Sequence, residues 1–437
     1  MHLLYSIVFT CGFILALPYF LLQALLHRKY LSSLRQRLGS LPREVKAAPE
    51  GSIWIHAVSV GEVLASLPLI RAIQIEWPER GLLVSTTTVT GQTLARGKLP
   101  GGVNLVYFPL DWRFAVRRSL DAIRPSLVLV AETEIWPNFL RECHDRQIPV
   151  LLVNGRISDR SVGRYRMVRG FMRRVLSDFR WCGMQTALDC ERLLSLGANP
   201  DKVEVCGNLK YEIAAPEGIE KKIEVYRGLL RLGSGKFVVV AGSTMQDEEG
   251  QVLAAFKRLH LQCPQAVLIL APRHPERFTE VEALISAEGF AYRKRSELES
   301  GNGNAGVEVI LLDSMGELAV LYGLADVVFI GGSLVPTGGH NILEPALYLK
   351  PVLFGPHMSN FREISKHFLE QQAAVQVGNG SELGEKFLEL LRDADARRRM
   401  GESGYAILAS NRGAVQKILG RVKQEVRTVQ CEVRGPD

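Results

Sequence analysis

The chain has 437 residues, of which 47% are hydrophobic and 23% are charged. This length and composition predict two or three domains with their own cores and exclude an intrinsically disordered chain. The 53 Lys and Arg exceed the 46 Asp and Glu by a net charge of +7, which is too small for a dedicated nucleic-acid-binding protein. The cysteines are scattered and form no CxxC pair, which favours reduced thiols and a cytosolic compartment.

The N-terminal segment from Leu3 to Leu26 carries no charge. As a helix it would extend about 36 Å, enough to cross a hydrocarbon core of about 30 Å. Positive charges follow this segment, which leaves the rest of the chain on the cytoplasmic side by the positive-inside rule; they are Arg28, Lys29, Arg35, Arg37, Arg43 and Lys46. We expect an uncleaved transmembrane anchor over residues 1–27 and a basic linker over 28–49. A cleaved signal peptide and a helix lying on the membrane surface are the alternatives.

Short apolar runs then alternate with segments of helical period, which is typical of parallel sheets covered by helices on both faces. Such runs occur at residues 53–57, 82–86, 104–108, 127–131 and 150–153, and again at 237–241, 267–271, 309–312, 327–330 and 352–354. The segment between the two series is rich in glycine and lacks an apolar run. We therefore expect an α/β protein of two Rossmann-like domains, over residues 50–212 and 237–426, joined by 213–236 and followed by a tail over 427–437. Ligands of such sheets bind beyond the carboxyl ends of the strands, here in a cleft between the domains.

The sequence HAVSVGE at residues 56–62 places Glu62 in the first turn of a helix that follows a strand. The helix dipole favours the ionised carboxylate there, which also weakens it as a base. Glu62 is therefore either an ordinary acidic residue at a helix N-terminus or a general base that deprotonates an acceptor hydroxyl.

Glu132 and Glu134 directly follow the very apolar run at residues 127–131. Two carboxylates in that position are costly unless they are paired across the fold or used in chemistry. A metal site lacks the expected companions, because the only Asp-x-Asp, at Asp393 and Asp395, lies in a segment that reads as a solvated helix surface. Lys210 follows a short strand at 203–206; it is either a surface lysine or a partner for a donor carboxylate or phosphate.

The second domain offers groups suited to phosphate. Ser243 and Thr244 follow one strand and Arg273 follows another, and hydroxyls, backbone amides and a guanidinium are phosphate ligands. The segment 331–345 contains a glycine loop with Gly339 and His340 that leads toward a helix, where a phosphate could approach backbone amides. It matches neither GxGxxG nor GxxxxGK[ST], and a purely structural glycine turn is the alternative.

A cluster of arginines interleaved with apolar residues spans residues 156–174 and reads as a basic amphipathic segment. We expect it to face an anionic lipid substrate or phospholipid headgroups; a solvated basic face and a nucleic-acid surface are the alternatives. Its members are Arg156, Arg160, Arg164, Arg166, Arg169, Arg173 and Arg174.

These motifs together resemble the 3-deoxy-D-manno-octulosonic acid (Kdo) transferases of lipopolysaccharide assembly, which have the GT-B fold. The resemblance covers nearly the whole chain and rests on HAVSVGE, ETEIWP, GNLKYE, AGST, LAPRHPERF, MGEL, GGHNILEP and FGPHMSNF in this order. It implies an inverting, metal-independent transfer of Kdo from CMP-Kdo to the tetraacylated lipid A precursor, lipid IVA, at the cytoplasmic face of the bacterial inner membrane. No cofactor and no nucleic acid are expected.

The resemblance also assigns residues. Glu62 matches the family's catalytic base, which acts on the 6'-hydroxyl of the acceptor glucosamine, and Glu132 and Lys210 match positions that support the transition state. The CMP-binding segments match Pro272, Arg273, Met315, Gly316, Glu317, Asn341, Ile342, Leu343 and Glu344. A nucleotide-sugar epimerase would share the glycine loop but has no use for an anchor, and a noncatalytic membrane adaptor would leave Glu62 and Glu132 without a purpose.

Overall fold

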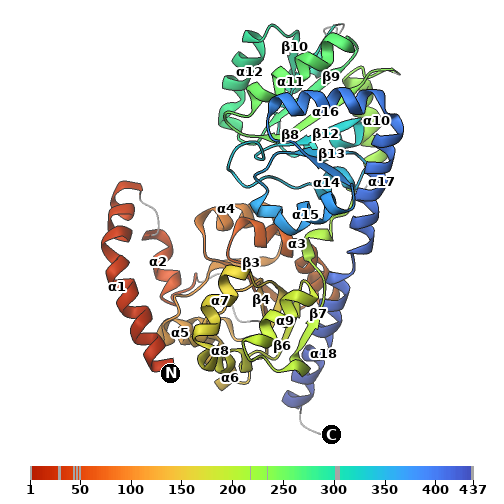
Figure 1. The fold of residues 1–437 in the computed structure, drawn as a ribbon. Helices are drawn as coiled ribbons and strands as arrows, with labels where there is room; N and C mark the ends of the chain where they lie inside the picture. The colour runs from red at the N-terminus through yellow and green to blue at the C-terminus, as the bar shows by residue number, and fades with distance from the viewer. Residues whose placement is uncertain are drawn as a thin grey trace. The chain divides into compact units, whose positions relative to one another are not determined.

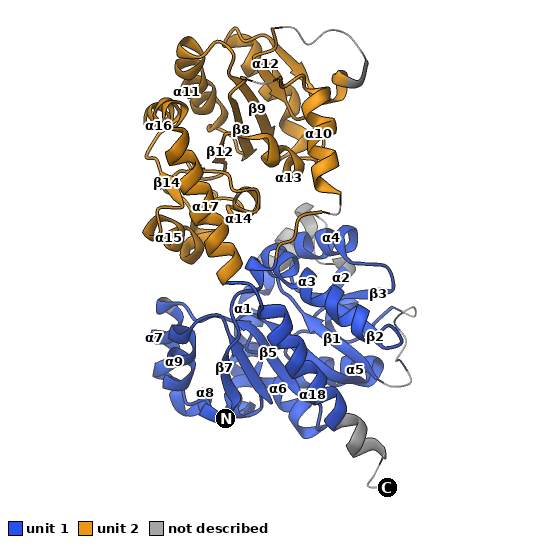
Figure 2. Ribbon diagram, turned by 90° about the vertical axis from the view of Figure 1, so that its right-hand side faces the viewer, with its two compact units in different colours: residues 1–212, 411–437 blue, residues 213–410 orange. Residues whose placement is uncertain are grey.

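The structure is a computed structural model that describes residues 2–27, 31–42, 45, 48, 51–216, 218–233, 235–300 and 306–434. It divides into two compact units (Figures 1 and 2). Unit 1 contains residues 1–212 and 411–437, and unit 2 contains residues 213–410. Each unit has one parallel sheet, so the predicted pair of α/β domains is confirmed.

The sheet of unit 1 has the strand order β3-β2-β1-β4-β5-β6-β7, and its neighbouring strands pair in parallel. Alternate side chains of its buried strands supply two cores, one on each face. The strands are β1 (Ser52–His56), β2 (Gly81–Thr86), β3 (Val103–Tyr107), β4 (Pro125–Ala131), β5 (Val150–Gly155), β6 (Trp181–Met184) and β7 (Val203–Val205).

The helices of unit 1 that lie between β1 and β7 in the chain are the crossover connections of the parallel sheet, and others lie toward the two ends of the chain. They are α1 (His2–His27), α2 (Leu31–Arg37), α3 (Val60–Glu76), α4 (Val89–Lys98), α5 (Arg113–Ile123), α6 (Pro137–Asp145), α7 (Asp159–Met167), α8 (Arg169–Ser177), α9 (Ala187–Ser195) and α18 (Ala414–Arg434).

The C-terminal helix α18 returns to unit 1, which differs from the predicted domain boundary at residue 426. Ala414, Ile418 and Val422 recur at helical spacing and are buried in one core of unit 1. The Glu212 carboxylate accepts hydrogen bonds from the amides of Gly413 and Val415, at 2.7 and 3.2 Å, and so caps this helix. The predicted tail over 427–437 is helical through residue 434, and its last three residues lie outside the described part.

The first half of α1 packs against unit 1. Phe13 meets the Trp112 ring edge-on with centroids 4.7 Å apart, and the Trp112 indole donates a hydrogen bond to the Thr10 hydroxyl at 3.0 Å. Where the structure describes the chain, no helix has the length and apolar character needed to cross a bilayer, so the expected transmembrane anchor over 1–27 is not found. The side chains of residues 19–27, and the linker residues Arg28, Lys29, Arg43 and Lys46, lie outside the description.

The sheet of unit 2 has the strand order β10-β11-β9-β8-β12-β13-β14, again with parallel neighbours. The expected connection over 213–236 contains a helix, α10, that belongs to this unit. The strands are β8 (Val238–Thr244), β9 (Val267–Pro272), β10 (Tyr292–Lys294), β11 (Val309–Leu311), β12 (Val327–Ile330), β13 (Val352–Phe354) and β14 (Ala374–Gln376). The helices are α10 (Ile219–Leu229), α11 (Glu249–Gln262), α12 (Phe278–Ala287), α13 (Leu318–Leu321), α14 (Leu343–Ala346), α15 (Arg362–Glu370), α16 (Gly380–Arg392) and α17 (Ala394–Ser410).

Candidate active site

The two predicted acids of unit 1 follow neighbouring strands. β1 pairs in parallel with β4. From β1 the chain continues to β2 toward one edge of the sheet, and from β4 it continues to β5 toward the other edge. Such a reversal of strand order opens a crevice at the carboxyl ends of parallel strands. Glu62 follows β1 and Glu132 follows β4, so the topology brings the two predicted catalytic acids to one switch point.

Glu62 lies in the first turn of α3, as predicted, and only 8% of its surface is exposed. The amide of Val58 donates to Glu62 Oε2 at 2.8 Å, and the Ser59 hydroxyl donates to Oε1 at 2.9 Å. Burial, reinforced by the negative charge of Glu132, raises the pKa of Glu62 to about 7, against the effect of these two hydrogen bonds. The helix dipole, which the sequence indicated would favour the ionised form, is therefore outweighed.

Glu132 is held by a strained backbone. Its φ of +55° lies in the left-handed region that non-glycine residues rarely adopt, and its amide donates to the Val153 carbonyl at 2.9 Å. Burial raises the pKa of the nearby Glu134, and the charge of Glu132 acts in the same direction. The unfavourable burial of several carboxylates together thus raises the pKa of both Glu62 and Glu134.

Lys210 joins the same cluster. Burial lowers the pKa of Lys210, as does the positive charge of Arg156, while the carboxylates of Glu132 and Glu62 raise it. The structure therefore places Lys210 within electrostatic range of both acids and of Arg156. A mixed cluster of this kind can take up a proton at one group and stabilise an anion at another.

A network of buried and half-buried amide side chains, which was not predicted from the sequence, holds the segment that carries Lys210. Asn154 Oδ1 accepts from the Leu209 amide at 2.9 Å, and Asn208 Oδ1 accepts from the Lys210 amide at 2.9 Å. Gln185 connects them, because it donates to the Asn154 carbonyl at 3.0 Å and accepts from Asn208 at 2.9 Å. A polar residue directly after the apolar run at 150–153 was the signal available in the sequence.

The predicted arginine segment forms two short helices, α7 and α8, that meet at Val168. Arg156 is half-buried beside Lys210, and the side chain of Arg160 is outside the described residues. The other five are exposed and are called the arginine face below: Arg164, Arg166, Arg169, Arg173 and Arg174. Met167 in their midst is 86% exposed, so the amphipathic prediction holds for α8, whose apolar side is buried, but less so for the end of α7.

In unit 2, predicted donor-binding residues gather around Arg273, whose amide donates to the Thr244 carbonyl at 2.9 Å. Burial raises the pKa of Glu344, while Arg273 and a hydrogen bond from Asn341 at 3.1 Å hold it down. Burial and the positive charge of Arg273 lower the pKa of His340 to about 4, so its imidazole is neutral at pH 7. These groups come from the ends of β8 and β9, from the loop before α14 and from α14 itself.

One expectation for unit 2 needs correction, and two side-chain contacts were not predicted. The helix after the glycine loop, α14, has only four residues, so it provides little of the helix dipole that was expected to stabilise a phosphate. At the start of the glycine segment, the amides of Gly332, Ser333 and Leu334 all donate to Glu248. Glu317, in a predicted CMP-binding segment, directs its carboxylate to Arg295 at 2.8 Å.

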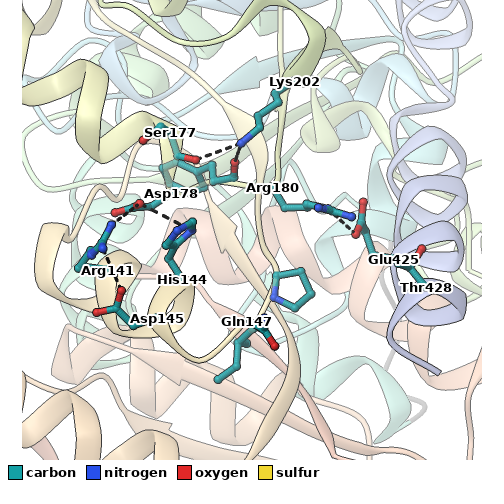
Figure 3. Close-up of a pocket in the computed structure, with 13 residues that line it drawn as sticks. Arg141, His144, Asp145, Gln147, Ser177, Asp178, Arg180, Lys202, Glu425 and Thr428 are labelled. Atoms are coloured by element: carbon teal, nitrogen blue, oxygen red, sulfur yellow. Dashed lines mark hydrogen bonds and ion pairs between the residues drawn. The ribbon is translucent and has the colours of Figure 1, made fainter. Parts of the chain in front are cut away.

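Figure 3 shows a cavity of about 710 Å³ in unit 1. It lies near the amino ends of β5, β6 and β7, whereas Glu62 lies beyond the carboxyl end of β1. Two of its arginines are paired, Arg180 with Glu425 at 3.1 Å and Arg141 with Asp145 at 3.0 Å, and Lys202 donates to the carbonyls of Ser177 and Phe179. It therefore contributes nothing to the predicted site. Within the described ranges, no group of three or more His, Cys, Asp or Glu is arranged to hold a metal ion.

Comparison with known proteins identifies the family. A family model described as 3-deoxy-D-manno-octulosonic-acid transferase matches residues 32–213. A 3-deoxy-D-manno-octulosonic acid transferase of Haemophilus influenzae is 36% identical over 396 residues, which cover 90% of this chain and 92% of that protein. The chain belongs to the Kdo transferase family. A Kdo transferase of Bordetella pertussis is 32% identical over 88% of this chain and 89% of its own length.

A comparison with solved structures concerns the fold. The UDP-GlcNAc 2-epimerase of Neisseria meningitidis matches 85% of this chain and all of its own, with a TM-score of 0.57 and 16% identity. At that identity the match shows the fold alone, an α/β GT-B-like arrangement of two parallel sheets, and does not favour an epimerase. The sequence matches thus identify the chain as a Kdo transferase, and its fold agrees with that identification.

Proposed function

We propose that this Kdo transferase moves Kdo from CMP-Kdo to the lipid A precursor lipid IVA, with inversion and without a metal, and that Glu62 is the general base. The observation that carries the proposal is the environment of Glu62, whose pKa is raised to about 7 by burial and by Glu132. A base with a pKa near the working pH combines a useful ionised fraction with useful basicity.

In the proposed reaction, Glu62 accepts the proton of the acceptor hydroxyl as the hydroxyl oxygen bonds to the anomeric carbon of Kdo. The bond from that carbon to the CMP phosphate oxygen breaks, and its electron pair leaves with CMP. Arg273 would offset the charge that develops on the phosphate, and Lys210 with Arg156 would offset the carboxylate of the sugar. Met315 and Gly316 remain proposed contacts of the CMP moiety.

Transfer from CMP-Kdo to lipid IVA in detergent with excess chelator tests this proposal. We expect wild type to turn over and Glu62→Gln to lose at least about 100-fold in kcat. Glu76→Gln, at the exposed end of the same helix and paired with Lys423 at 2.8 Å, is the control and should keep activity. Full activity of Glu62→Gln would remove the base assignment, and loss of wild-type activity in chelator would remove metal independence.

We also propose that the enzyme works at the cytoplasmic face of the inner membrane and that the arginine face contacts anionic headgroups there. Exposed arginines around the exposed Met167 combine electrostatic attraction with an apolar contact. The double variant Arg169→Glu/Arg173→Glu should bind vesicles containing anionic lipid more weakly than wild type. Arg398→Glu/Arg399→Glu, exposed on α17 with the same charge change, should bind as wild type does; equal loss in both pairs would refute a specific face.

A further inference from the structure

Glu248 is a buried carboxylate to which the reaction proposed above assigns no role. Its exposed fraction is 0%, and it lies between the end of β8 and the start of α11. Oε2 accepts from the amides of Met245 and Gly332, at 3.1 and 2.7 Å. Oε1 accepts from the amides of Ser333 and Leu334, at 3.1 and 2.9 Å. The carboxylate therefore has four backbone donors, which is an arrangement that a bound anion would otherwise occupy.

The four amides belong to two different loops. Met245 follows β8, whereas Gly332, Ser333 and Leu334 follow β12, and β8 and β12 are neighbours in the sheet. The chain proceeds from β8 to β9 on one side and reaches β12 on the other, so this is the switch point of the unit 2 sheet. Glu248 thus ties the two loops that border the crevice where a ligand of such a sheet binds.

Each tied loop carries predicted donor-binding residues. Ser243 and Thr244 precede Met245, and Ser243 is strained, with φ +58° at an irregularity in the pairing of β8 with β9. The Gly332 carbonyl accepts from the Gly339 amide at 2.7 Å, so the position of Gly332 also fixes the segment that contains His340. The loops touch closely, because a Cβ added to Gly331 would lie 2.5 Å from the Ser243 carbonyl oxygen.

We propose that Glu248 is a positioning residue for donor binding, because it joins the loops after β8 and β12 and thereby sets the places of Ser243, Thr244, Gly339 and His340. This inference rests on the proposed function of unit 2 as the donor-binding unit. Glu248 does not need to touch the donor, because its oxygens are already bound by the protein's own amides. Burial raises the pKa of this carboxyl and the amides oppose that rise.

Glu248→Gln tests the proposal, since the amide side chain has the same shape but turns an NH2 group toward two of the four donors. We expect the KM for CMP-Kdo and the Kd for CMP to rise about tenfold, with the KM for the acceptor unchanged. Glu249→Gln is the matched control: Glu249 is the next residue and is also buried, but it is paired with Arg277 at 2.6 Å. This control should change the melting temperature and leave the donor KM within about twofold of wild type.

Gly331→Ala is a second test, because it leaves Glu248 in place and pushes the two loops apart. It should raise the KM for CMP-Kdo as Glu248→Gln does. It keeps the proposal testable if Glu248→Gln fails to fold. Calorimetric binding of CMP to the whole protein supplies the readout. If wild type binds CMP and Arg273→Ala weakens it, but folded Glu248→Gln and Gly331→Ala bind as the control does, the positioning role is wrong. If wild type does not bind CMP, the proposed function of unit 2 fails first.

Discussion

Replacing Ser59 with alanine should raise the pH at which the transfer rate reaches half of its maximum. The Ser59 hydroxyl donates to Glu62 Oε1 at 2.9 Å and favours the ionised carboxylate. A hydrogen bond to a charged group contributes about 1.5 kcal/mol, so Ser59→Ala should raise the pKa of Glu62 by roughly one unit above about 7. The ionised fraction at pH 7 then falls from about a half to about a tenth, and the rate falls about fivefold, whereas at pH 9 the two rates should nearly coincide.

The assay is kcat/KM for Kdo transfer measured across pH, with Ser66→Ala as the control. Ser66 is buried on the same helix, and its hydroxyl has no partner within the described part of the chain. The reasoning is refuted if Ser59→Ala lowers the rate by the same factor at every pH, or if the acidic limb moves to lower pH. Either result would mean that Glu62 is not the group whose ionisation limits the reaction.

Three further predictions concern stability and positioning. The pKa of Glu62 in the folded state, about 7, exceeds its ordinary value of 4.5, so the chain loses stability as pH rises between these values. Glutamine resembles the protonated side chain and does not ionise. Glu62→Gln should therefore raise the free energy of unfolding, measured by urea titration, by up to about 3 kcal/mol at pH 8 and by little at pH 4. Glycine can adopt the φ of +55° found at Asn154, but Asn154→Gly removes the acceptor for the Leu209 amide, so kcat should fall about tenfold. Arg124→Gly, at a φ of +48°, is the control and should keep the wild-type kcat. Equal kcat in the two variants would show that Asn154 does not position the segment that carries Lys210. Trp112→Ala removes the ring on which α1 packs, and limited proteolysis should then cut α1 faster, with an unchanged cleavage rate speaking against that packing.

The sequence predicted the two α/β units because parallel strands are buried on both faces and so appear as continuous apolar runs between helices of period 3.6. It could also place Glu62, Glu132 and Lys210 beyond strand ends, since Glu62 and Glu132 follow such runs and Lys210 follows a short predicted strand. The assignment of α18 to the wrong unit came from the same local reasoning. An amphipathic helix reports that one face is buried, but not which core buries it.

The tertiary structure decided the chemistry of these residues. Periodicity cannot show that β1 and β4 are neighbours, so the effect of Glu132 on the pKa of Glu62 could not be predicted until the strand order was known. The sequence likewise does not show which groups accept hydrogen bonds from the amides of the glycine loop at its start, residues 332–334. Glu248 lies more than 80 residues away along the chain, and only folding brings its carboxylate to those amides.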